Sequence, residues 1–119
     1  MNIDYQTSAY STGGRDGHVR VENSPIDFEM ALPAGLGGKK LDGVNPEQLF
    51  AAGYAACFGS ALQHVIRVRR LNLPAPDVQA TVGIGRNEAR NFQLEVHLLA
   101  IVDTDDAALA ESITQEAHQ

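Results

Sequence analysis

The stretch that decides the fold is NPEQLFAAGYAACFGSAL, residues 45–62. It opens with helix-start signals, because Asn45 is a favoured N-cap residue and Pro46 suits the first helical position. Leu71-Asn72-Leu73-Pro74 supplies the stop, since the residue before a proline disfavours helical geometry. The pattern predicts a central helix over residues 45–70.

This helix is apolar on nearly every side from Leu49 to Leu62, so it should be buried on every side. A domain of 119 residues has difficulty surrounding such a helix alone, and small residues along it allow close packing. We therefore expect a homodimer in which two such helices meet.

The apolar run from Leu49 to Leu62 and its flanks are also long enough for a membrane span. Its many alanines and its polar residues favour a buried core helix instead: Gln48, Ser60, Gln63 and His64.

The segments around the helix indicate an α+β fold. Residues 1–32 read as N-terminal strands with turns, residues 33–44 as a glycine-rich loop, and residues 78–102 as two strands that alternate in polarity. Residues 105–119 show apolar residues at four-residue spacing, which predicts a second helix. We expect one domain, 1–119, with an antiparallel-rich sheet packed on the central helix.

Composition excludes several classes of protein. The net charge of -6 disfavours a nucleic-acid partner, because phosphate binding needs clustered positive charge. The single cysteine forms no internal disulfide, and the polar N-terminus lacks the apolar segment of a signal peptide. The sequence predicts a cytoplasmic protein that is not bound to a membrane, with no metal site and no bound cofactor.

Cys57 lies in the middle of the central helix, and a lone cysteine there is ordinarily a small core residue. The thiolate is the reactive form of cysteine, so a functional Cys57 needs a cation beside it. His64 shares its helix face but lies about 10 Å along the axis, too far for a direct pair. No pattern places the other histidines nearby: His18, His97 and His118. Arg15, in a glycine turn, is a better candidate because a guanidinium keeps its proton.

Several segments together resemble the organic hydroperoxide resistance proteins of the OsmC/Ohr superfamily. The segment from Asn45 to Phe58 closely resembles their signature, and Thr12-Gly13-Gly14-Arg15-Asp16-Gly17 resembles their arginine loop. Weaker similarities run through the rest of the chain: Leu73-Pro74, Val82-Gly83-Ile84-Gly85, Leu94-Glu95-Val96 and Glu116-Ala117-His118-Gln119. These segments favour the hydroperoxide subtype over the related osmotically induced peroxidases of the same fold.

The resemblance implies an intertwined homodimer and a thiol-dependent peroxidase that reduces fatty-acid, alkyl or aryl hydroperoxides to alcohols. It implies that Cys57 is the peroxidatic cysteine, that Arg15 holds its thiolate and polarises the peroxide, and that Glu47 pairs with the arginine. The reductant it implies is a dihydrolipoyl protein or another dithiol. The apolar flank formed by Phe50, Phe58 and Leu62 suits an organic substrate better than hydrogen peroxide.

Helix geometry adds an expectation about the dimer. Glu47 and Cys57 are ten residues apart, or roughly 15 Å along one helix. One arginine does not readily bridge both within a chain, so we expect Arg15 and Glu47 to act on the Cys57 of the other subunit.

The family pattern also continues past the segment matching Ala117-His118-Gln119, with a resolving cysteine and a last strand that these 119 residues lack. The alternative is therefore a member that performs only the first half-reaction, or a non-catalytic structural or binding dimer.

Overall fold

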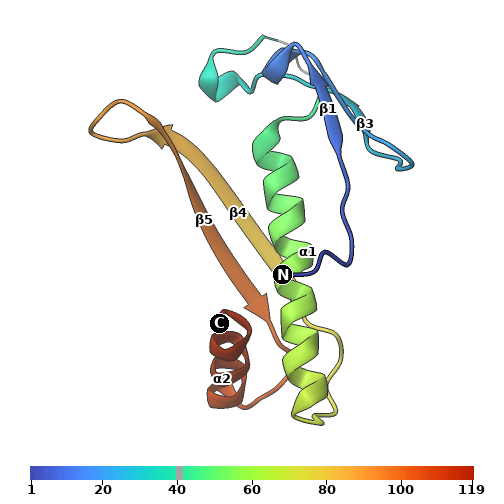
Figure 1. Ribbon diagram of the computed structural model, residues 1–119. Helices are drawn as coiled ribbons and strands as arrows, with labels where there is room; N and C mark the ends of the chain where they lie inside the picture. The colour runs from blue at the N-terminus through green and yellow to red at the C-terminus, as the bar shows by residue number, and fades with distance from the viewer. Residues whose placement is uncertain (40–41) are drawn as a thin grey trace. The chain divides into compact units, whose positions relative to one another are not determined.

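The computed structural model describes residues 1–39 and 42–119, and these form two compact units, Met1–Leu49 and Phe50–Gln119. The fold is α+β with antiparallel sheets and one long helix, as the sequence predicted (Figure 1). The prediction of one domain over 1–119 stays a prediction, and each unit is described by itself.

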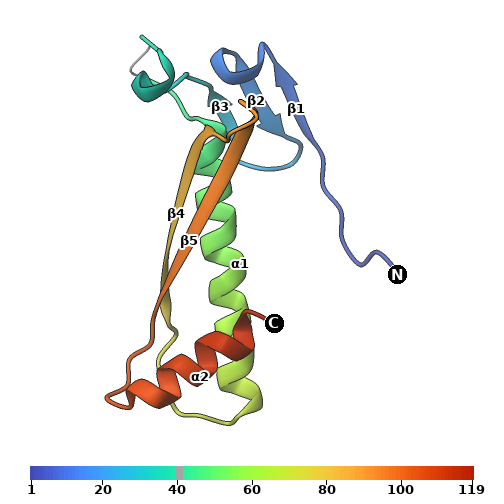
Figure 2. The ribbon, with the colours of Figure 1, turned by 90° about the vertical axis from the view of Figure 1, so that its left-hand side faces the viewer.

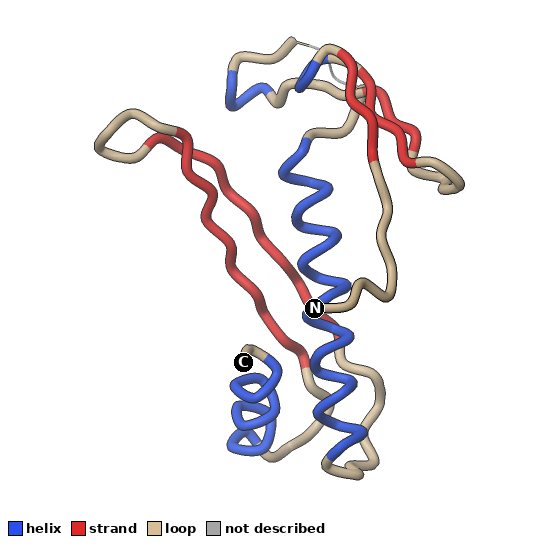
Figure 3. The backbone as a smooth tube through the Cα atoms, in the orientation of Figure 1, coloured by secondary structure: helices blue, strands red, loops and turns tan. Residues whose placement is uncertain are grey.

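The first unit is built on a three-stranded antiparallel sheet with the strand order β1-β2-β3 (Figure 3). Its strands are β1 (Ala9–Thr12), β2 (His18–Val21) and β3 (Asp27–Glu29). Two short 3-10 helices, η1 (Gly14–Asp16) and η2 (Ala34–Leu36), interrupt the connections. Among the described residues of this unit, Met30 and Ala31 are the buried apolar ones, and Met30 forms a parallel bridge with Val44 just before the long helix. This bridge ties the glycine-rich loop back to the sheet.

The long helix α1 spans Pro46–Val68, two residues short of the predicted C-terminal limit. Its start is a reciprocal capping box. The Gln48 backbone N–H donates to Asn45 Oδ1 at 2.9 Å, and the Asn45 backbone N–H donates to Gln48 Oε1 at 3.0 Å. The predicted N-cap at Asn45 is confirmed, while the part played by Gln48 was not predicted.

The end of α1 is set by Arg70, whose φ of 57° is left-handed. The Leu71 N–H donates to the Ile66 carbonyl and the Arg70 N–H to the Arg67 carbonyl, each at 3.0 Å. These two bonds are those of a Schellman motif, in which the left-handed position usually holds glycine. The helix therefore ends before Pro74 exerts its effect.

The second unit adds a long hairpin and a short helix to α1. The strands β4 (Asp77–Arg86) and β5 (Phe92–Ile101) pair antiparallel over their full length, and α2 spans Ala107–Ala117. Asp106 caps α2 by accepting a hydrogen bond from the Leu109 N–H.

Figure 2 shows α2 lying against the C-terminal half of α1. Arg69 joins this end of α1 to α2 by donating to Glu116 Oε1 at 2.6 Å and to Ser112 Oγ at 3.0 Å.

The core of the second unit lies between α1, α2 and the inner face of the hairpin. Its buried members are Phe58, Leu62, Val65, Ile66 and Ile113. On α1 they occur at four- and three-residue intervals, so they form a single stripe.

Nearer the start of α1, Phe50 is 44% and Tyr54 43% exposed. The expectation of burial on every side is therefore not met in this part of α1.

By length and composition alone, α1 is long and apolar enough to cross a membrane. Its 18-residue window has a mean hydropathy of 1.3, and 22% of that window is buried. A helix of that kind is weak evidence for a membrane span, because core helices of soluble proteins pass the same test.

Candidate active site

Arg15 is held by a turn that only glycines permit. Gly13 and Gly14 have φ values of 79° and 59°, in the left-handed region. A Cβ on Gly17 would lie 1.7 Å from the Thr12 carbonyl oxygen, so no side chain fits there. The Gly17 carbonyl accepts a hydrogen bond from the Met30 N–H at 2.8 Å, which anchors the turn to the sheet. The turn sequence thus fixes the backbone from which Arg15 extends.

The Arg15 guanidinium binds the Glu47 carboxylate through two parallel hydrogen bonds. The Nη1–Oε2 distance is 2.9 Å and the Nη2–Oε1 distance is 2.6 Å. This bidentate arrangement is the strongest form of an Arg–carboxylate pair and fixes the plane of the guanidinium. The pairing that the resemblance implied is present, within the first unit.

Burial and charge act in opposite directions on this pair. The hydrogen bonds from Arg15 hold the pKa of the Glu47 carboxyl below its usual value of 4.5, although burial of the carboxyl alone would raise that pKa. The Glu47 side chain is 10% exposed and that of Arg15 is 36% exposed. The pKa of Arg15 is raised by the same hydrogen bonds. The pair is therefore charged on both sides at neutral pH, with one edge of the guanidinium facing outward.

Cys57 belongs to the second unit and is a free, exposed thiol on α1. It lines a cavity of about 530 Å³ between α1 and α2. The other residues of this cavity, here called the thiol cavity, are Ser60, Ala61, His64, Val65, Arg67, Glu116, Ala117 and Gln119. Within this chain Cys57 is exposed, unlike a small core residue.

The four histidines have distinct surroundings. His64 lines the thiol cavity with Cys57, about two helical turns farther along α1. His118 packs edge-on against Phe58, with ring centroids 6.1 Å apart.

His97 lies 3.0 Å from Glu95 on the exposed face of the hairpin. His18 lies between two β3 carboxylates, and its hydrogen bonds to Glu29 and then Asp27 raise its pKa above 6.5. Among the described residues none of the four is hydrogen-bonded to Cys57, so a Cys–His dyad gains no support.

The three residues predicted to contact substrate are placed differently from one another. Phe50 is exposed on α1, one side of Phe58 faces the core, and Leu62 is fully buried there. A fully buried side chain meets a substrate only if the chain rearranges around it. Substrate contact by these residues stays a prediction, and Phe50 is the accessible one.

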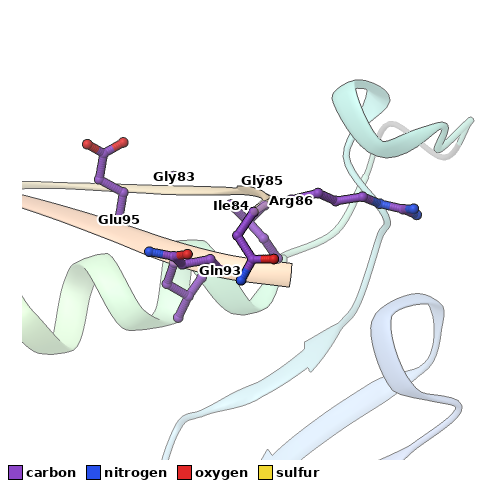
Figure 4. A pocket seen from close by; sticks show the side chains of 8 residues that line it. Gly83, Ile84, Gly85, Arg86, Gln93 and Glu95 are labelled. Carbon is purple, nitrogen blue, oxygen red and sulfur yellow. The ribbon is translucent and has the colours of Figure 1, made fainter. Parts of the chain in front are cut away.

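A second hollow, of about 340 Å³, lies at the tip of the hairpin, where two glycines leave the strand surface bare. Figure 4 shows Glu95 standing beside Gly83 and Arg86 extending from the tip. The Arg86 guanidinium carbon is 4.9 Å from the Phe92 ring centroid, a cation–π contact. Its lining residues include no cysteine, serine, threonine, lysine or histidine. Within residues 1–39 and 42–119, no group of three or more His, Cys, Asp or Glu side chains is arranged to hold a metal ion.

Comparison with known proteins settles the family. The family model described as OsmC-like protein matches residues 37–119. The chain belongs to the OsmC-like family.

Within that family its relatives are organic hydroperoxide resistance proteins. One from Xanthomonas axonopodis pv. citri is 40% identical over 116 residues, covering 97% of this chain and 81% of that protein. Another, from Bacillus subtilis, is 36% identical over 110 residues, covering 90% of this chain and 78% of that protein.

Solved structures show the same OsmC-like fold. An organic hydroperoxide resistance protein from Elizabethkingia anophelis, with thiocyanate bound, superposes with a TM-score of 0.92 at 44% identity. That comparison covers 100% of this chain and 85% of the other. The Bacillus subtilis protein gives a TM-score of 0.85 at 33% identity, covering 96% and 84%. The resemblance found in the sequence, and the α+β fold it implied, are confirmed.

Sequence reasoning missed two cavity residues, Arg67 and Glu116. Glu116 comes from α2, whose approach to α1 depends on tertiary packing. Arg67 belongs to α1 itself. Its three-residue spacing from His64 was the available signal, since such residues share a helix face.

Proposed function

We propose that this chain reduces organic hydroperoxides with Cys57 as the attacking thiolate, as part of an oxidative-stress defence in the cytoplasm. The observation that carries the proposal is the exposed Cys57 thiol in a cavity of about 530 Å³, in a member of the hydroperoxide resistance family. An exposed thiol in a cavity large enough for an organic molecule has both the access and the space that the reaction needs.

The proposed half-reaction uses only protein groups and the peroxide. The Cys57 thiolate attacks the terminal oxygen of R–O–OH, an S–O bond forms and the O–O bond breaks. The sulfur is oxidised by two electrons to a sulfenic acid, and the alkoxide that leaves takes a proton to become R–OH. No metal or bound cofactor enters this step. A dithiol, such as a dihydrolipoyl protein, then reduces the sulfenic acid and releases water.

Arg15 and Glu47 are the proposed source of positive charge for the thiolate. A guanidinium fixed by a bidentate carboxylate presents its remaining N–H groups in a set direction, and it cannot neutralise the thiolate by losing a proton. We propose that the pair acts on the Cys57 of a second copy. Support comes from the roughly 15 Å of helix between Glu47 and Cys57, and from the exposed aromatic rings of Phe50 and Tyr54 on α1.

The apolar surroundings favour organic substrates over hydrogen peroxide. Phe50 and Tyr54 lie on the same helix as Cys57 and expose aromatic surface. Aromatic and alkyl groups gain about 25 cal/mol per Å² of apolar surface that they bury, which hydrogen peroxide does not offer. We expect cumene hydroperoxide to react faster than hydrogen peroxide.

Mass spectrometry of the intact protein after one equivalent of cumene hydroperoxide tests the proposal. Cys57 should gain one oxygen atom, and a dithiol should remove it. The matched control, Cys57→Ser, should keep its mass under the same treatment. An unmodified Cys57 in folded protein would reject the peroxidase and favour the alternative, a non-catalytic dimer of the same fold. A faster reaction with hydrogen peroxide would reject only the substrate preference.

A further inference from the structure

His18 is the first residue of β2 and directly follows Gly17, the last glycine of the turn that carries Arg15. Its ring lies between two carboxylates of the neighbouring strand. The Nδ1 atom is 3.0 Å from Glu29 Oε1, and the Nε2 atom is 2.5 Å from Asp27 Oδ1. The strand register explains this arrangement, because His18 is paired with Glu29, and Asp27 lies two residues earlier on the same face of β3. Both ring nitrogens therefore meet an acceptor.

The charged imidazolium is the form of His18 that satisfies both contacts. An ionised carboxylate has acceptor oxygens and no donor, whereas a neutral imidazole has one N–H and one lone pair. In a neutral ring, one nitrogen would turn its lone pair toward a carboxylate oxygen. Proton binding removes that repulsion and places a positive charge between two negative ones. The pKa of His18 is accordingly raised above 6.5, first by the hydrogen bond to Glu29 and then by that to Asp27.

The other neighbours of His18 on this sheet keep one charge near neutral pH. On β1 the residue paired with His18 is Thr12, which has no charge. Arg20 lies two residues farther along β2, with its guanidinium carbon 4.5 Å from the centroid of the Tyr10 ring. A guanidinium keeps its proton. Of the groups at this position, His18 is the one whose charge changes near neutral pH.

The end of β3 joins the turn of Arg15 to the segment that enters α1. Glu29 is the last residue of β3, and its carbonyl accepts a hydrogen bond from the Val44 N–H at 2.9 Å. The next N–H along the chain, that of Met30, donates to the Gly17 carbonyl at 2.8 Å. The first bond fixes the approach to α1, and the second fixes the turn that carries the guanidinium. A contact that steadies this end of β3 therefore steadies both sides of the Arg15 ion pair.

We propose that protonated His18 is a positioning residue for Arg15, because it holds β2 to β3 directly after the arginine turn. The inference rests on the proposed role of Arg15 in peroxide reduction. In this role His18 does not touch the reacting atoms and works through the backbone of the turn. Its contribution is fully present below about pH 6.5 and is lost as the pH rises through the higher folded-state pKa. Glu47 stays charged over this range, since its pKa lies below 4.5.

Two measurements between about pH 5.5 and pH 9 test this role, a range that brackets the ordinary pKa of histidine. Hydrogen exchange of the Met30 N–H reports how firmly the turn is held. The rate of Cys57 thiol loss with cumene hydroperoxide reports how well Arg15 serves the reaction. Protection from exchange and peroxide rate are each expressed as the ratio of the unaltered chain to His18→Gln at the same pH. This ratio cancels the intrinsic pH dependence of amide exchange and of the thiolate.

Both ratios should be about two to five at the acidic end, as suits two exposed charged contacts. They should fall to about one at the alkaline end, where the ring is neutral. His18→Arg keeps its positive charge at every pH, so its own ratios to His18→Gln should stay above one throughout. The matched control is His97→Gln, which removes a histidine that lies 3.0 Å from Glu95 on the hairpin. This control should behave as the unaltered chain does.

The possible failures are separable. If Cys57 of folded protein does not react with cumene hydroperoxide, the peroxidase function falls, and this positioning role falls with it. If Cys57 reacts but the rate ratio is equal at both ends of the pH range, only the positioning role is overturned. A rate ratio that falls while the Met30 exchange ratio stays flat also overturns it, because the effect would not pass through the turn. Equal effects of His18→Gln and His97→Gln would overturn it too, since they would reflect overall charge.

Discussion

A single turn of glycines gives Arg15 its direction. Gly17 packs so closely on the Thr12 carbonyl that even alanine would force the backbone apart. The guanidinium that extends from this turn is then oriented by two hydrogen bonds to Glu47. Orientation matters for the proposed chemistry, because a thiolate and a peroxide must both be met by fixed N–H groups.

Replacing Glu47 by glutamine should change how stability depends on pH. The folded-state pKa of Glu47 lies below 4.5, so the unfolded chain binds the proton more tightly. The stabilisation is therefore present above about pH 4.5 and is lost as the pH falls through the folded pKa. Glu47→Gln should cost about 1–2 kcal/mol near neutral pH, at the low end because Arg15 is partly exposed. Urea unfolding at a series of pH values measures this.

The double variant Arg15→Met with Glu47→Gln identifies the cause. If the pair is responsible, the double variant should unfold with the pH profile of the single one. A profile as steep in Glu47→Gln as in the unaltered chain would contradict the prediction.

Arg70 occupies a left-handed position that suits glycine better. An L-residue there carries a steric cost of roughly 1–2 kcal/mol that glycine avoids, partly offset by the greater freedom of glycine in the unfolded chain. Arg70→Gly should therefore stabilise the protein by about 0.5–1 kcal/mol in thermal or urea unfolding. Arg67→Gly, three residues earlier inside the helix, should destabilise it by about 1 kcal/mol. The same sign for both variants would be inconsistent with the motif.

At the scale of elements, α1 was the most predictable part of the molecule because its signals are local. Asn45 and Pro46 predicted its start, and the apolar run from Leu49 to Leu62 indicated its length. Its end was predicted to within two residues, but the left-handed geometry of Arg70 was not, since an arginine carries no sequence signal for it. The Arg15–Glu47 pair came from family resemblance alone, because its partners meet only through the path of the intervening sheet.

The thiol cavity was the part of the site that sequence spacing could not supply. Helix geometry correctly separated His64 from Cys57, and that separation argued against a direct pair. It gave no reason to expect that α2 would complete a cavity with Glu116 and join both residues to one space. Contacts between distant elements depend on packing, which one sequence does not reveal.

The core stripe of α1 should be sensitive to the loss of single side chains. Leu62 is fully buried between α1 and α2, while Leu99 on the outer face of the hairpin is 56% exposed. Leu62→Ala should lower the free energy of unfolding by about 2–5 kcal/mol, through lost burial and the void left behind. Leu99→Ala makes the same chemical change and should cost under about 0.5 kcal/mol. Comparable costs for the two would show that α2 does not pack on α1 as described.

At the scale of the whole molecule, the exposed aromatic residues near the start of α1 are the feature that one chain leaves unexplained. Phe50 and Tyr54 expose aromatic surface eight and four positions before Phe58, the first core residue of the same helix. A second copy in closed two-fold symmetry covers such a surface on both chains at once. Light scattering on purified protein should therefore report a dimer.

A mixed dimer tests whether the site is shared between copies. Arg15→Ala and Cys57→Ser should each be inactive alone. Co-expressed, they should form dimers in which one site combines the Cys57 of one chain with the Arg15 of the other, and peroxidase activity should return. A mixed dimer that forms but stays inactive would show that both residues act within one chain.

The Arg15–Glu47 contact joins residues 32 positions apart. Closing a flexible loop of that length costs about 3 kcal/mol of chain entropy, more than one partly exposed ion pair returns. The strands β1, β2 and β3 must therefore pair first and shorten the loop before the guanidinium can reach the carboxylate. We therefore expect the contact to form late in folding, so that a newly made chain carries its thiol before it carries an oriented arginine.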